Sequence, residues 1–132
     1  MNAAGLMLCD DLIFFSRVSG TARASGLVVK QVRTATAMVH AARQAQPNCV
    51  ILDLQNEGLD LSALLTQLHE ACPAMPRTVA FGSHVEAETL RAARQLGCDL
   101  VMPRSQFAEK LEDSLKEWLG EARAVANVQN SE

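Results

Sequence analysis

Aromatic residues are scarce in this chain of 132 residues, which has no tyrosine, one tryptophan and four phenylalanines. The formal net charge is −3, and the lysines and arginines are scattered along the sequence rather than clustered. Proteins that bind nucleic acid usually present a basic surface to the phosphates and aromatic rings to the bases. The sequence therefore predicts no nucleic-acid partner.

Long apolar runs are also missing, since none approaches the roughly 20 residues that a membrane-spanning helix needs. The N-terminus lacks the basic and apolar segments of a signal peptide. The cysteines show neither CxxC spacing nor a histidine pattern typical of zinc, so we expect them to be reduced and structural. They are Cys9, Cys49, Cys72 and Cys98. These absences lead us to expect a cytoplasmic protein with no membrane partner.

Short apolar runs alternate with segments of helical spacing. Strands are expected at 6–9, from 27 onward, at 48–53, at 78–81 and at 99–102. Helices are expected at 12–24, from the cap residue Thr34 to about Gln46, from the cap Asp60 to about Ala71, at 85–96 and after the cap Ser105. On the first helix, the residues available for burial are Leu12, Ile13, Phe15, Val18 and Ala22. This alternation predicts βαβ units and one doubly wound α/β domain over 1–126, with a frayed polar tail at 127–132.

Acidic residues follow two of the expected strands at the point where each strand ends. Asp10 and Asp11 come after the first apolar run, and Asp53 ends the third. The carboxyl ends of parallel strands meet at one edge of the sheet, so we expect these three side chains to converge there. Like charges at close range are costly unless a cation or a proton lies among them. The pattern therefore predicts a metal site, a phosphoryl-accepting site or a remnant of one.

Four short motifs, in this order and at these intervals, resemble the receiver domains of two-component response regulators over roughly residues 5–120. They are Leu8-Cys9-Asp10-Asp11 after the first strand, Val50-Ile51-Leu52-Asp53-Leu54 on the third strand, Gly58-Leu59-Asp60 in the following loop and Gly97-Cys98-Asp99 before the fifth strand. The resemblance implies a flavodoxin-like (βα)5 fold, whose five-stranded parallel sheet has the order 2-1-3-4-5.

The resemblance also implies a role for each residue at this edge. Asp53 would be the phosphoacceptor, and Mg²⁺ would be held by Asp10, Asp11, Asp53 and the backbone carbonyl of Gln55. A histidine kinase or phosphotransfer protein would supply the phosphoryl group. Such a domain is a phosphoacceptor with at most weak autophosphatase activity rather than an enzyme. No output module is attached, so we expect a stand-alone domain that acts through a downstream protein partner. The resemblance allows a homodimer through the fourth helix, fifth strand and fifth helix.

Three positions depart from the receiver pattern. Gly82 falls where receivers carry Ser or Thr, with Ser83 one step further on, and Val101 falls near the usual aromatic residue of the fifth strand. Arg104 falls where receivers carry Lys, and its planar fork differs in reach from a compact ammonium group. A hydrogen bond to a charged phosphoryl oxygen is worth roughly 1.5–3 kcal/mol, so its loss weakens the usual switch.

Two interpretations therefore stay open from the sequence. The first is a receiver that is phosphorylated on Asp53. The second is a pseudo-receiver, a protein-interaction module that is never phosphorylated and in which Arg104 neutralises the acidic cluster. A third interpretation, an α/β enzyme or small-ligand binder that uses the same crevice, lacks support because no DxDxT, GxSxG or glycine-rich phosphate loop is present.

Overall fold

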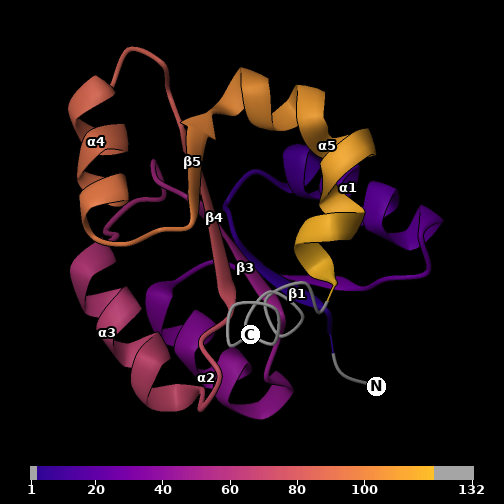
Figure 1. Cartoon of the computed structure of the whole chain (residues 1–132), viewed down its shortest axis with the longest axis horizontal. Coiled ribbons are helices and arrows are strands. Elements are labelled where there is room, and N and C mark those ends of the chain that lie inside the picture. Colours follow the sequence, from indigo (N-terminus) through magenta and orange to yellow (C-terminus); the bar gives the residue numbers. More distant parts are fainter. Residues whose placement is uncertain (1–2, 121–132) are drawn as a thin grey trace, which may run out of the picture.

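The computed structural model describes residues 3–120, which form one parallel sheet in the order β2-β1-β3-β4-β5, with helices on both faces (Figure 1). The strands are β1 (Gly5–Leu8), β2 (Val29–Val32), β3 (Cys49–Asp53), β4 (Arg77–Gly82) and β5 (Leu100–Pro103). The helices are α1 (Leu12–Ala24), α2 (Ala35–Ala45), α3 (Leu61–Ala71), α4 (Ala87–Gln95) and α5 (Arg104–Leu119). The predicted α/β class and strand order are confirmed, and the tail predicted at 127–132 lies outside the described residues.

The sheet separates two apolar layers. Because successive side chains of a strand point to opposite faces, Leu6 and Leu8 pack with α2 and α3, while Met7 and Ile51 pack with α1 and α5. Every residue of β1 and β3 is buried, as their uninterrupted apolar runs predict for central strands covered on both faces. Figure 1 shows α1 and α5 on one side of the sheet and α2, α3 and α4 on the other. The acidic residues predicted to matter therefore lie at one edge of a sandwiched sheet.

The helix caps are confirmed for α2 and α3 and wrong for α5. The side chains of Thr34 and Asp60 each accept a hydrogen bond of 3.1 Å from the backbone N–H three residues further on. Ser105 is not a cap, because α5 begins at Arg104 and the extended Pro103 takes the N-cap position. Proline fits there because its restricted φ is compatible with the extended backbone of Pro103 and it has no N–H to satisfy. Arg104 consequently lies in the first turn of α5, at the carboxyl edge of the sheet.

Two further boundaries differ from the prediction. β2 begins at Val29 rather than Leu27, because the N–H of Leu27 still bonds to the carbonyl of Ala22 at the end of α1, and the chain joins the sheet at Val28. α4 is shorter at both ends than 85–96, since the chain first closes a hydrogen-bonded turn after β4. The later starts of β2 and α4 thus arise from local backbone hydrogen bonds in the preceding turns, Leu27 N–H to Ala22 and Glu86 N–H to Ser83, which periodicity does not report.

The buried face expected for α1 is correct only toward its C-terminal end. Val18 and Ala22 are buried and Phe15 is half-buried, but Leu12 is 56% exposed and Ile13 is 86% exposed. The first turn of α1 lies at the carboxyl edge, where the sheet ends and gives apolar side chains little to pack on. Two large apolar side chains are therefore exposed next to the acidic residues.

Candidate functional site

The carboxyl edge of the sheet brings Asp11, Asp53 and Arg104 together. Asp53 is the last residue of β3 and is only 6% exposed. Asp11 is the N-cap of α1, and its Oδ1 accepts a hydrogen bond of 2.9 Å from the backbone N–H of Phe14. Asp10 precedes it in the same loop and is exposed. The convergence predicted for this edge thus holds for Asp11 and Asp53, which share one basic partner.

That partner is the guanidinium group of Arg104, which lies between the two carboxylates. Its Nη1 is 3.3 Å from Oδ2 of Asp11, and its Nη2 is 3.2 Å from Oδ2 of Asp53. The guanidinium carbon is 4.5 Å from the centre of the Phe14 ring and 5.3 Å from that of Phe81. Two carboxylates and two aromatic rings therefore hold one cation, an arrangement in which ion pairing and cation–π attraction act together.

Backbone and thiol groups complete the surroundings of Asp53. Its Oδ1 accepts a hydrogen bond of 3.0 Å from the N–H of Gln55, whose side chain is exposed. The thiol of Cys9 lies 3.8 Å from Oδ2 of Asp53, and burial raises the pKa of this thiol, so it stays protonated and donates. The hydrogen bond from Phe14, reinforced by Arg104, lowers the pKa of Asp11. Asp11 is thus held as a carboxylate, and Oδ2 of Asp53 faces a cation and a neutral donor.

The residues as arranged do not fit the Mg²⁺ ion that the resemblance implies. Within residues 3–120, no group of three or more His, Cys, Asp or Glu side chains is positioned to hold a metal ion. In both Asp11 and Asp53, one carboxylate oxygen bonds to a backbone N–H and the other to Arg104. Magnesium requires a near-octahedral set of oxygen ligands, and here the guanidinium already bridges the two carboxylates.

The positions that receivers use for switching have packing and turn roles here. Gly82 is buried at the end of β4, where an added Cβ would lie 3.4 Å from the Leu90 side chain and 3.5 Å from that of Leu54. The hydroxyl of Ser83 accepts a hydrogen bond of 3.3 Å from the N–H of Val85, within the turn before α4. Val101 is half-buried against the apolar layer beneath α2 and α3. The hydroxyl next to Gly82 thus serves the local turn.

Sequence analysis missed the aromatic part of this site. Phe81 stacks on Phe107 with ring centroids 4.6 Å apart, Phe107 stacks on Trp118 at 5.6 Å, and Phe14 meets Phe81 edge-on at 5.3 Å. Helical spacing favoured Phe15 over Phe14 for burial, although both are half-buried. One signal was present: Phe14 is the third residue after the cap Asp11, which places its backbone N–H next to that carboxylate. The direction of its ring had no such signal.

No protein-family model matches the sequence, and no curated protein matches it. Solved structures do match. NtrX from Brucella abortus superposes with a TM-score of 0.78 and 23% identity over 100% of this chain, which spans 30% of the NtrX chain. The signal receiver domain of a putative LuxO repressor from Vibrio parahaemolyticus superposes with a TM-score of 0.76 and 15% identity. The match covers 97% of this chain and 98% of that domain. A response regulator from Thermotoga maritima superposes with a TM-score of 0.72 and 14% identity. The match covers 90% of this chain and 98% of that regulator.

These similarities and the topology define a flavodoxin-like α/β protein. More narrowly, the chain has the fold of the receiver domains of response regulators. In the part of the chain that the structure describes, no helix is both long and apolar enough to cross a bilayer.

Proposed function

We propose that this chain is a pseudo-receiver: a protein-interaction module with the receiver fold, in which Arg104 neutralises the acidic edge and signalling does not depend on phosphorylation. One observation carries the proposal, namely the guanidinium of Arg104 placed 3.3 Å from Asp11 and 3.2 Å from Asp53. It supports a structural role for these carboxylates, since each is already compensated by a basic group from the same chain.

The surroundings of Asp53 support the same proposal chemically. To accept a phosphoryl group, a carboxylate oxygen must reach the phosphorus, and a cation must neutralise the charge that develops on the transferring group. Asp53 is 6% exposed, its Oδ1 accepts from the N–H of Gln55 and its Oδ2 pairs with Arg104. Phosphorylation would require the Arg104 pair to open first. Gly82 would then offer no hydroxyl to the phosphoryl oxygens, and Ser83 would have to leave its turn.

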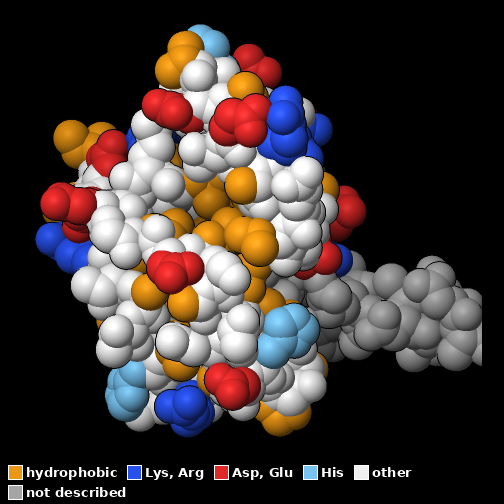
Figure 2. Space-filling view, turned by 90° about the vertical axis from the view of Figure 1, so that its left-hand side faces the viewer, with side chains coloured by type: hydrophobic (Ala, Val, Ile, Leu, Met, Phe, Trp, Pro, Cys, Tyr) orange, Lys and Arg blue, Asp and Glu red, His pale blue; other side chains and the backbone are white. Residues whose placement is uncertain are grey.

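The surface beside α4 supports binding to a protein partner. Three large apolar side chains lie exposed on or next to α4 and β5: Val85 at 73%, Leu96 at 44% and Leu100 at 37%. Figure 2 shows apolar side chains gathered in a hollow between α4 and α3. The hollow is a cavity of about 330 Å³, lined in part by Leu65, Met75 and Leu96. Leu96 both lines this recess and belongs to the exposed apolar residues beside α4. Exposed apolar groups are typical of interaction surfaces, so we place the partner, or a second copy of the chain, on this side.

The second candidate is a phosphoacceptor that works with Mg²⁺ and a histidine kinase or phosphotransfer protein. It is favoured by the position of Asp53 at the end of the third strand. The BeF3-activated receiver domain of nitrogen regulatory protein C matches this chain with a TM-score of 0.63 and 18% identity. For this candidate, Arg104 must swing away from both carboxylates to admit the metal and the phosphoryl group.

A mass measurement separates the two candidates. The chain is incubated with acetyl phosphate and Mg²⁺, and its intact mass is compared with that of Asp53→Asn treated in the same way. We expect no phosphoryl adduct on either protein, because Arg104 holds Asp53 and Gly82 lacks a hydroxyl. An adduct on the unsubstituted chain that disappears in Asp53→Asn would establish the phosphoacceptor instead. Turnover of a phosphomonoester would point to the enzyme interpretation.

A further inference from the structure

The hollow between α3 and α4 has groups that select the chemistry of a partner. Resting on the proposed function, we infer that this hollow is an anchor site for an arginine side chain of a separate protein partner. The apolar walls receive the stem of that side chain, and the carboxylate of Asp99 and the hydroxyl oxygen of Thr66 accept hydrogen bonds from its guanidinium group. The site takes no part in the pairing of Arg104 with Asp53, which lies at the other edge of the sheet.

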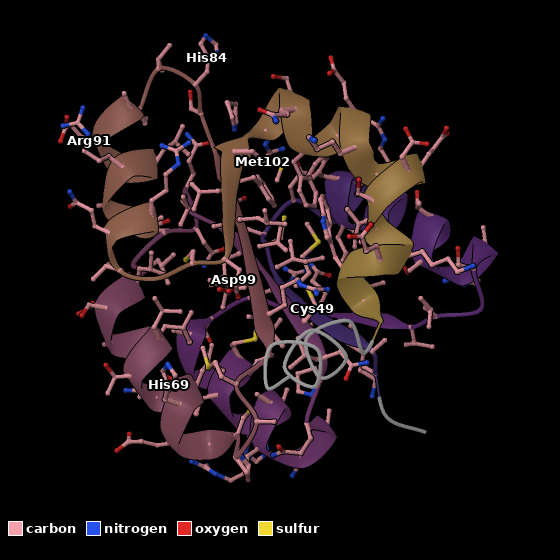
Figure 3. All side chains as sticks on the ribbon, viewed as in Figure 1. Cys49, His69, His84, Arg91, Asp99 and Met102 are labelled. Atoms are coloured by element: carbon pink, nitrogen blue, oxygen red, sulfur yellow. The ribbon has the colours of Figure 1, made fainter. Side chains whose placement is uncertain are left out.

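The hollow lies at the amino edge of the sheet, where β4 and β5 begin. Thr78 is the second residue of β4, Gly97 forms the turn after α4, and Asp99 directly precedes β5. Figure 3 shows His69 on α3 and Asp99 near the start of β5. The cavity volume of about 330 Å³ is near the lower end of the range for ligand pockets, so it suits one long side chain rather than a large cofactor.

The carboxylate of Asp99 is fixed by reciprocal hydrogen bonds with Thr78, which is only 2% exposed. Oδ2 of Asp99 accepts from the backbone N–H of Thr78 at 2.8 Å and from its hydroxyl at 3.0 Å. The backbone N–H of Asp99 donates to the same hydroxyl at 2.9 Å. A negative charge is therefore held at the wall of the hollow before a partner arrives, which reduces the cost of ordering groups on binding.

Two hydroxyl groups that line the hollow have already donated their protons. The hydroxyl of Thr66 donates to the backbone carbonyl of Ser62 at 3.0 Å, and that of Thr78 donates to Asp99. Because a hydroxyl has a single proton, the oxygen of Thr66 can offer a ligand only an acceptor. None of the described residues that line the hollow is a lysine or an arginine. The lining therefore complements a cation with many donors and disfavours an anion.

Arginine fits this lining better than lysine. Its guanidinium group carries five N–H donors in one plane and can pair with a carboxylate through two parallel bonds, whereas an ammonium group is compact and strongly hydrated. Its aliphatic stem can lie along the apolar walls, which are formed by Leu65, Met75 and Leu96. Arginine is also enriched among the residues that dominate binding at protein interfaces.

The test titrates the isotope-labelled chain with N-acetyl-arginine-amide and follows the backbone amide signals by NMR. A single side chain should bind with a dissociation constant of about 1 mM, and the signals that move should belong to residues of the hollow. N-acetyl-citrulline-amide is the matched probe, since citrulline has nearly the same shape and no positive charge. It should bind about tenfold more weakly, because its hydrogen bonds to Asp99 lack charge on the donor.

Asp99→Asn removes the negative charge and keeps an oxygen that can accept from Thr78, so the preference for the arginine probe should be lost in a folded protein. Asp113→Asn is the matched control, because it makes the same change at an exposed position of α5, on the other side of the sheet. It should bind the arginine probe as the unsubstituted chain does. If Asp99→Asn does not fold, Thr66→Val takes its place, and the loss of one acceptor should weaken binding several-fold.

Three results would overturn the inference. The first is that the arginine probe does not bind, or binds no better than the citrulline probe. The second is that a folded Asp99→Asn keeps the preference for the arginine probe. The third is self-association of the free chain, measured by sedimentation, that disappears in Asp99→Asn, since the hollow would then belong to a second copy of the chain.

Each of these results leaves the pseudo-receiver proposal intact, because that proposal depends on Arg104 and Asp53 at the carboxyl edge. A phosphoryl adduct on Asp53, measured separately, would contradict the pseudo-receiver. Binding of the arginine probe at the amino edge does not depend on that outcome, so the two failures can be told apart.

Discussion

At the scale of single residues, Asp11 has two roles that depend on its negative charge. One oxygen caps α1 through the N–H of Phe14, and the other pairs with Arg104. Both partners favour the ionised form, and together they outweigh the partial desolvation of the carboxyl group, so the pKa of Asp11 is lowered. The charge on this one side chain thus contributes to starting a helix and to holding a basic group over the sheet edge.

The lowered pKa of Asp11 predicts how stability depends on pH. The folded pKa lies below the ordinary value of 3.8, so the unfolded chain binds more protons between the two values. The contribution of Asp11 is therefore complete above that ordinary value and is lost as the pH falls through the folded pKa. Urea unfolding at several pH values below about 5 should show a steeper loss for the unsubstituted chain than for Asp11→Asn, which keeps a capping side chain but has no charge to titrate. Parallel curves for the two proteins would contradict this.

The position of Arg104 could be predicted from the sequence, but its reach could not. Its match to the Lys position of receivers placed it near the fifth strand, and the structure has Arg104 directly after β5, as the first residue of α5. Whether its side chain turns toward Asp53 depends on the rings of Phe14 and Phe81, which come from α1 and β4. The local spacing of residues does not report how groups from distant elements orient a side chain. The placement of Arg104 between Asp11 and Asp53 is therefore evident only from the structure.

At the scale of elements, hydrogen bonds at chain ends decide where each helix and strand begins. Asp11, Thr34 and Asp60 each satisfy a backbone N–H in the first turn of the helix that follows. The sequence predicted the last two caps because a short polar side chain before a helical pattern is a local signal. It missed the start of α5, where Pro103 replaces a polar cap, and the start of β2, which is set by pairing with β1.

Removing the cap of α2 should cost measurable stability. Thr34→Ala deletes the hydroxyl that accepts from the backbone N–H of Ala37 at 3.1 Å, and such losses typically cost about 1 kcal/mol in the free energy of unfolding. Thr36→Ala makes the same chemical change two residues later, at an exposed position inside the helix. Because alanine favours helix interiors, Thr36→Ala should be neutral or slightly stabilising in chemical denaturation. Equal effects of the two substitutions would mean that the cap contributes nothing.

At the scale of the whole molecule, a line of stacked rings connects the acidic edge with the far end of α5. It runs from Phe81 on β4 to Phe107 and then Trp118 on α5. Phe107 and Trp118 fall at helical spacing along α5, and both are buried. The alternation of apolar runs and helical segments thus sufficed to predict the layers of the fold. The order in which the rings stack could not be predicted, because it depends on how α5 packs against β4.

Phe107 should be among the most costly core positions. It is fully buried and stacks between Phe81 and Trp118, so Phe107→Ala removes a large apolar surface and leaves a cavity. Substitutions of this kind cost about 3–5 kcal/mol, which is a large share of the stability of a small domain. Gln106→Ala, on the exposed side of the same helix, should change the free energy of unfolding by less than about 0.5 kcal/mol. A Phe107→Ala cost below about 1 kcal/mol would refute the central place given to this ring.

The same stacked rings connect the single tryptophan of the chain with the acidic edge, so its fluorescence can report on that edge. Trp118 is the single indole of the chain, and its ring lies two stacking steps from the ring against which Arg104 rests. We expect any ion, phosphoryl group or partner that moves the guanidinium away from Phe81 to alter the surroundings of Trp118 through the stacked rings. The intrinsic tryptophan fluorescence of the unlabelled protein is therefore a suitable signal with which to screen for ions and partners that bind at the acidic edge.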